Sequence, residues 1–437
     1  MRFWLVIVLG GLLINSTAQE TSVKKSDPLR PLIFKLNDSG DRFVRVMTWH
    51  QLWLTTGDLG QNQPLAITPM LRRSRLLGYA QLGPRVLMLG HMGLNNLNAK
   101  NLTATGIEGD GPQLFLHDAW VEYKFSPLLF VGGGLHYWNG LTRMTSASTF
   151  TFLTLDNPAP NIGWPQLGYT QQFGRNFGVY AKGERGKMDY RISINQPLVQ
   201  NFEVSKSLTA LNNHHTIYYS WGLLNGQKGQ VTTEGYFRWH LWDKETNVLP
   251  FTRGTYLGQK SLFTLGAGFF YHPQGSIALP STSEPVDVTL SGEALYQDIS
   301  AKTRLYDVWH VAGDILLEKP LTNQTVLTTY LSVQKFNYGP DWLGKWTGSG
   351  YAGYGHVAVL HQATKLQPYL AYQRRHWEAH QLSSRPVGYT LDLGINYYLH
   401  EHQTKFTLEY HQVNNSGEVS TREKDLQQIR FQAQLAL

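Results

Sequence analysis

The densest group of cationic side chains in the chain is Arg72-Arg73-Ser74-Arg75. Because successive side chains of a β-strand point to opposite faces, Arg73 and Arg75 are expected to share one face and Arg72 to lie on the other. Two cations on one face favour anionic solutes or phosphate groups. The alternative is that they are ordinary solvated side chains at a rim.

Two further pairs of residues combine charge with informative spacing. Lys182 and Arg191 fall on two strand patterns joined by the tight turn 184–187, and Arg191 belongs to the polar face of its strand. Arg143 and Asp156 are the only charged residues of the long connection 139–172. Facing each other or a wall, these two opposite charges would set up a local electric field.

Catalytic chemistry finds little support in the sequence. The chain has no Cys, which removes thiol nucleophiles and thiolate metal ligands. No G-x-S-x-G nucleophile motif occurs, and His214-His215 and the scattered histidines lack a metal-ligand spacing. The net charge of +7 is modest and the aromatic residues follow strand faces, so nucleic-acid binding is not indicated. We therefore predict no catalytic residue, metal or cofactor.

Alternating strands are the elements that must position these charges. In MDYRISINQ, Tyr190, Ile192 and Ile194 oppose Arg191, Ser193 and Asn195, and the same period of two recurs from Phe43 onwards. No apolar pattern of helical period persists after the first residues. We count about 16 strands, with 18 as the alternative; the stretch 273–304 is the ambiguous part.

The connections between strands sort into two classes. Tight ones lie near 83–85, 126–127, 184–187, 363–365 and 400–404. Long ones lie near 55–69, 96–112, 139–172, 197–213, 337–352, 378–387 and 414–426. Short turns at one rim and long loops at the other are typical of transmembrane β-barrels. The alternation continues through the last segment, IRFQAQLAL, which we expect to pair with the first strand and close the barrel.

The first residues read as an export signal. Met1-Arg2 precedes an apolar run from Phe3 to Ile14, followed by small residues and a predicted cleavage after Ala18. The run is too short to span a bilayer core of about 30 Å. We expect a signal peptide at 1–18, a polar periplasmic leader at 19–42 and the barrel at 43–437. An aromatic content of 13% and 42 Gly suit such a barrel.

The order of several segments resembles a known family. RFVRVMTWHQLWL, MLRRSRLLGYAQL, DAWVEYKFSPLLFVGGGLHYWNG, FGVYAKGERGKMDYRISINQP and LGINYYLHEHQTKFTLEYH are similar to strands of Gram-negative outer-membrane porins of the phosphate-selective (O/P-like) superfamily, especially the Bacteroidetes type. The resemblance implies a passive channel, usually a homotrimer, with a long loop folded inward as a constriction. In that interpretation 139–172 is the constriction loop, and Arg73, Arg75, Arg143, Asp156, Lys182 and Arg191 line the pore or set its selectivity.

The sequence therefore predicts an outer-membrane porin for small hydrophilic solutes with weak anion preference. Its expected partners are outer-membrane lipid, lipopolysaccharide and small polar or anionic solutes. A dedicated phosphate channel is not favoured, because no long Arg or Lys ladder follows successive strands. Two alternatives stay open: a barrel enzyme of the phospholipase or protease type, and a soluble secreted β-rich glycan-binding protein.

Overall fold

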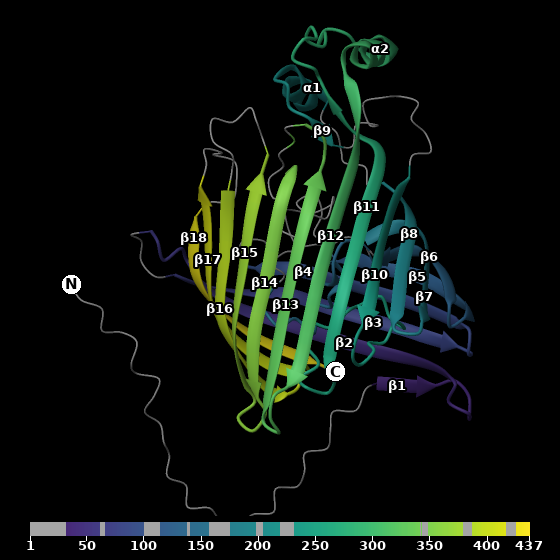
Figure 1. Cartoon of the computed structure of the whole chain (residues 1–437), viewed down its shortest axis with the longest axis vertical. Coiled ribbons are helices and arrows are strands. Elements are labelled where there is room, and N and C mark those ends of the chain that lie inside the picture. The colour runs from purple at the N-terminus through teal and green to yellow at the C-terminus, as the bar shows by residue number, and fades with distance from the viewer. Residues whose placement is uncertain are drawn as a thin grey trace, which may run out of the picture.

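The computed structural model describes residues 32–61, 66–99, 114–137, 140–156, 175–197, 204–218, 231–340, 342, 348–378, 387–416 and 425–437. The expected signal peptide lies outside these residues, as does most of the expected leader. Figure 1 shows long, tilted strands that form the wall of a barrel, with α1, α2 and β9 beyond one end of it.

Sixteen antiparallel strands form a closed barrel, so the fold prediction and the strand number are confirmed. The barrel strands are β2 (Arg42–Thr56), β3 (Ile67–Leu82), β4 (Val86–Asn98), β5 (Phe115–Ser126), β6 (Leu129–Tyr137), β7 (Arg175–Arg185), β8 (Met188–Gln196), β10 (Thr232–His240), β11 (Leu262–Ala278), β12 (Arg304–Pro320), β13 (Thr325–Asn337), β14 (Gly350–His361), β15 (Leu366–Trp377), β16 (Val387–His400), β17 (Thr404–Ser416) and β18 (Leu426–Ala436).

The barrel closes where β18 pairs with β2, as the pattern of the last segment predicts. Gln432 lies opposite Trp53 and Gln434 opposite Gln51 across this seam. Both glutamines are buried inside, whereas Ile429 and Leu435 of the same strand are exposed outside. Closure leaves no unpaired edge along the wall.

The alternation of residue types explains which face of each strand points inward. In β15 the residues Gln367, Gln373 and Arg375 are buried, while Leu370 and Tyr372 are exposed. Exposed large apolar side chains recur on nearly every barrel strand. The barrel thus has an apolar outer surface and an interior rich in polar side chains.

Two short strands and two helices lie outside the barrel order. β1 (Leu32–Lys35) adds to one end of β2, and β9 (Ile217–Tyr218) adds to β11. The helices α1 (Val204–Asn212) and α2 (Gly292–Lys302) belong to long connections. The sequence pattern did not predict these two helices, because they are too short to show a sustained helical period. Helix α2 occupies part of the ambiguous stretch 273–304. Among the described residues, no helix is long and apolar enough to cross a membrane.

Most tight turns lie where the sequence predicts them, but one connection at the same rim does not follow the rule. The turns 83–85, 127–128, 186–187, 321–324, 362–365 and 401–403 alternate with the long loops. Between β10 and β11, however, residues 241–261 run from His240 to Leu262 at the short-turn rim. This connection folds into the barrel and shapes the site described next.

Candidate functional site: two inward segments and the cavity between them

Residues 140–156, here called the first inward segment, lie inside the barrel. Leu141, Phe152 and Leu155 are almost fully buried. The segment bonds to distant parts of the wall. Gln51 of β2 donates to the Thr149 carbonyl (2.9 Å), and Asn396 of β16 donates to the Leu153 carbonyl (2.8 Å). It therefore crosses the lumen. Asn139 and residues 157–172, which make up the rest of the predicted constriction loop, lie outside the described residues.

Residues 241–261, the second inward segment, enter from the opposite, short-turn rim and meet the first. Thr252 N–H donates to the Ser146 carbonyl (2.8 Å), and Ser148 N–H donates to the Thr252 carbonyl (2.9 Å). Gly254 permits this approach, because an added Cβ there would lie 2.4 Å from the Thr151 carbonyl oxygen. The two segments form one interior body joined by main-chain bonds.

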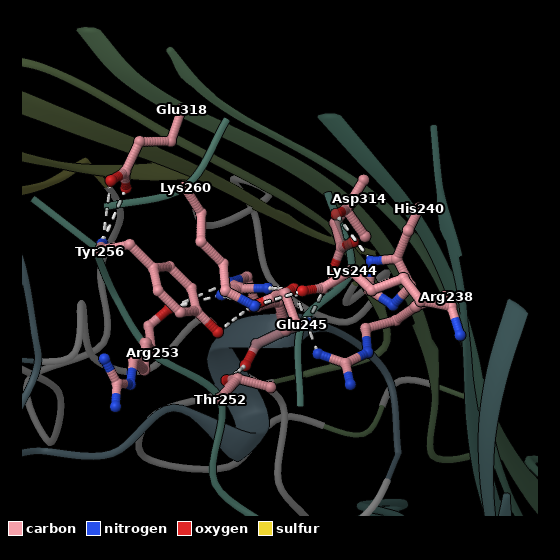
Figure 2. Close-up of polar contacts among 12 residues, drawn as sticks. Arg238, His240, Lys244, Glu245, Thr252, Arg253, Tyr256, Lys260, Asp314 and Glu318 are labelled. Atoms are coloured by element: carbon pink, nitrogen blue, oxygen red, sulfur yellow. Dashed lines mark hydrogen bonds and ion pairs between the residues drawn. The ribbon is translucent and has the colours of Figure 1, made fainter. Parts of the chain in front are cut away.

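A buried ion network holds the two segments together (Figure 2). Arg143 of the first segment forms a two-pronged ion pair with Glu245 of the second. Glu245 also accepts from Arg238 of β10 (3.2 Å) and from the Tyr256 hydroxyl (2.9 Å). Arg238 continues the network to Asp189 of β8 (2.9 Å).

The network keeps Glu245 ionised. Burial alone raises the pKa of a carboxyl, but the charges of Arg143 and Arg238 outweigh it and hold the pKa of Glu245 well below its ordinary range. A buried carboxylate with two guanidinium partners and a hydroxyl donor has its lone pairs satisfied. Arg143 therefore serves as an anchor between segments, and it does not face Asp156.

Two of the predicted site residues on the wall also form hydrogen bonds with the second inward segment. Arg191 donates to Asn247 Oδ1 (2.9 Å) and to the Pro250 carbonyl. Lys182 pairs with Glu122 (2.9 Å) and donates to the Val248 carbonyl. Both side chains point inward and bind this segment, Lys182 in addition to its ion pair with Glu122 of the wall.

Asp156, near the end of the first segment, is bound by two arginines of β3. Arg72 donates to Asp156 Oδ2 (2.8 Å), and Arg73 donates to Oδ1. Burial raises the pKa of Asp156, but the charges of Arg72 and Arg73 overcome this and lower it below its ordinary range. Asp156 thus holds the segment against the wall.

The prediction that Arg72 points away from Arg73 was wrong. The register between β2 and β3 shifts at this position, since Gln51 faces Arg73 while Leu52 faces Leu71. Arg72 is the extra residue of a β-bulge. A bulge breaks the period of two, so Arg72 reaches the same carboxylate as Arg73.

Arg75, like Arg191, has no ion-pair partner among the described residues, but unlike Arg191 it does not bind an inward segment. Its guanidinium donates to Asn95 Oδ1 (2.5 Å) and to the carbonyls of Ser74 and Leu94. It also lies over the ring of Phe115, 5.4 Å from the centroid. No carboxylate among the described residues lies within ion-pair distance of its guanidinium.

The buried wall charges are distributed unevenly around the barrel. On the half made by β3–β10 they are Arg73, Arg75, Arg175, Lys182, Arg191, Arg238, Asp118, Glu122, Asp189 and Glu234. On the half made by β12–β17 they are Asp314, Glu318, Asp392, Glu409, Arg375 and Lys405. Cations predominate on the first half and carboxylates on the second, which polarises the lumen across its width.

A cavity of about 460 Å³ remains between the two inward segments and the wall of β2–β5. Its lining includes Arg45, Arg75 and Arg175 from the wall and Arg253 from the second segment. Glu401 and Gln403 of a short turn also line it, which places the cavity towards the short-turn rim. Arg253 and Glu401 are exposed, so the cavity communicates with solvent.

Among the residues that the structure describes, two clusters of possible metal ligands face the lumen. They are His91, His117 and Asp118, and Asp392, Glu409 and His411. In the first, Arg175 donates to both Asp118 oxygens (3.1 and 3.2 Å), so a guanidinium already occupies the carboxylate. No sequence pattern predicts either group, because their members come from different strands that only the barrel brings together.

The comparisons with known proteins concern the fold. No family model and no curated protein matches the chain. Among solved structures, OmpF of Salmonella typhi in complex with daunomycin has a TM-score of 0.53 at 9% identity, covering 91% of this chain and 98% of that chain. The chain folds as a porin-type barrel.

Two other structural neighbours are also an outer-membrane channel and a porin. The outer-membrane channel DcaP of Acinetobacter baumannii has a TM-score of 0.51 at 11% identity, covering 92% of this chain and 99% of that chain. An anion-selective porin from Comamonas acidovorans has a TM-score of 0.50 at 10% identity, covering 90% of this chain and 99% of that chain. At such low identity these similarities establish the architecture alone.

Proposed function

We propose that this porin-type barrel is an outer-membrane channel for passive diffusion of small hydrophilic solutes, with a weak preference for anions. The observation that carries the proposal is the contrast between the two faces of the wall. Large apolar side chains are exposed outside, whereas charged and amide side chains are buried inside. Such a closed barrel suits a bilayer outside and water inside.

Charge in the lumen supports the anion preference. Arg75 and Arg45 line the cavity, and the described residues provide neither with a carboxylate partner. Arg253 adds a third guanidinium from the second inward segment. Arg73, Lys182, Arg191, Arg143 and Asp156 act differently in this proposal: they fix the inward segments that narrow the path, and selectivity is set by the cations left unpaired.

The finer assignments belong to the same proposal. They are export by the signal peptide 1–18, a periplasmic leader at 19–42, contact with lipopolysaccharide, a homotrimeric assembly and membership of the phosphate-selective superfamily. The resemblance of the strand segments supports the last two. The apolar outer surface supports residence in the outer membrane.

Planar bilayers test the channel directly. Purified protein is inserted under a KCl gradient, and step conductance and reversal potential are recorded. We expect discrete steps and a reversal potential displaced towards that of chloride. Folded, inserted protein without conductance would refute the channel. Conductance without chloride preference, unchanged in Arg75→Ala, would refute the role given to the unpaired arginines.

A further inference from the structure

The cavity near the short-turn rim has walls of aromatic rings. Trp49 and Phe150 lie with their ring centroids 6.0 Å apart, and Tyr137 and Phe251 lie 5.3 Å apart. These rings come from β2, β6 and both inward segments. Flat apolar surfaces on several sides favour a planar molecule between them, since aromatic pairs prefer offset or edge-to-face contacts at about 4.5–7 Å.

Hydrogen-bond donors without acceptors gather in the same lining. Among the described residues, the buried Arg45 Nε and Trp49 Nε1 have no hydrogen-bond partner. Each is a donor only. Unsatisfied buried donors are costly, so an acceptor supplied beside these two donors would be stabilising.

The lining of the cavity is mainly positive, which suits an anionic ligand. Arg45, Arg75 and Arg253 line the cavity without an ion-pair partner among the described residues, whereas Arg175 is neutralised by Asp118. Glu401 is the sole acidic side chain of the lining, and Gln259 donates to it (3.0 Å). The cavity is therefore a concave, mainly positive site with apolar sides.

Two histidines add acceptor capacity at the edge of the site. His91 and His117 direct Nδ1 at Asp118 (2.8 and 3.3 Å), which leaves each buried Nε2 without a partner. Both residues line the cavity. A donor Nδ1–H to a carboxylate leaves Nε2 as an acceptor, suited to a hydroxyl or amino substituent on the bound molecule.

From these observations we infer that the cavity binds an aromatic organic anion, with its carboxylate against Arg45 and Arg75 and its ring between Trp49 and Phe251. A volume of about 460 Å³ lies within the usual range of small-molecule sites, about 300–1,000 Å³. The inference extends the proposed function, because it takes such anions to be solutes that pause at this site in transit.

Equilibrium binding to the detergent-solubilised full chain tests the inference without requiring conduction. Calorimetry is run with 2-naphthoate, with acetate as a charge lacking the ring, and with 2-naphthalenemethanol as a ring lacking the charge. We expect saturable binding of naphthoate only. Arg45→Gln removes a charge-assisted contact and should weaken naphthoate binding about tenfold or more.

Arg42→Gln is the matched control, because it removes the same charge from the same strand and rim but Arg42 does not line the cavity. Equal binding of all three probes, or equal losses in the two variants, overturns the inference. Conductance in bilayers without naphthoate binding overturns it too and leaves the channel proposal standing. Naphthoate binding by a barrel that never conducts supports the site and refutes the channel.

Discussion

Replacing Glu245 by Gln removes the charge that joins the two inward segments while keeping the side chain's size. Glu245 is buried and faces Arg143, Arg238 and the Tyr256 hydroxyl. Removing one partner of a buried ion pair costs about 3–5 kcal/mol, because the remaining charge loses its compensation. Gln keeps one acceptor, so we take the lower end, about 3 kcal/mol.

The substitution destabilises the docked state by this amount, because both guanidinium groups are buried in that state. If the segments detach, Arg143 and Arg238 regain water. Since about 1.4 kcal/mol corresponds to a factor of ten, the ratio of detached to docked segments should rise about 100-fold. Single-channel recording in planar bilayers should then show larger and noisier steps than the unchanged protein.

Glu184→Gln provides the matched control. Glu184 pairs with Lys244 of the same inward segment at 3.5 Å, but both side chains are partly exposed. A pair of this kind contributes about 0–1 kcal/mol, so conductance should not change. If Glu245→Gln conducts like the control while its barrel remains folded, the buried network does not hold the segments in place.

Three further predictions follow from the same structure. Asp156→Asn should release Arg72 and Arg73 and move the reversal potential further towards that of chloride. The control Asp298→Asn on α2 should leave the reversal potential unchanged. A shift towards the reversal potential of potassium in Asp156→Asn would contradict the reasoning. The lowered pKa values of Asp156 and Glu245 mean that their ion pairs contribute stability above the ordinary carboxyl pKa of about 4 and lose it only as the pH falls through the lower folded values. The difference in reversal potential between Asp156→Asn and the unchanged protein should therefore persist from about pH 7.5 to 4.5, and its loss within that interval would refute the pairing. Gly268→Ala would place a Cβ 2.2 Å from the Leu141 carbonyl oxygen and should displace the first inward segment. Thermal unfolding should then show a free energy of unfolding lowered by about 1–3 kcal/mol. Gly313→Ala should be tolerated, because the nearest atom to its added Cβ is 3.8 Å away.

The wall of the barrel could be predicted from sequence because its information is local. Alternation in segments such as Tyr190–Asn195 fixes which face is apolar, and the sorting of turns fixes the direction of each strand. Strand number and closure follow from these two patterns. The bulge at Arg72 could not be predicted, because it depends on how β3 registers with β2.

The interior could be predicted only in part. The length and position of 139–172 predicted an inward loop, and its described part, 140–156, lies in the lumen. The second segment, 241–261, carries no such signal: its polar and Pro-containing composition resembles any surface loop. Its partners, Arg143 and Arg191, lie about 100 and 56 residues away from Glu245 and Asn247, so only the closed barrel brings them together.

The main-chain bonds between Ser146, Ser148 and Thr252 have a consequence for assembly. They join segments that hang from opposite rims, so neither segment gains its partner until the wall around both has formed. Contacts between residues so distant in sequence form late in folding. A newly closed barrel whose inward segments have not yet docked has a wider lumen than the finished protein. If the barrel is the channel proposed above, each insertion would pass through a more permeable state, and rapid docking would protect the permeability barrier as much as it stabilises the fold.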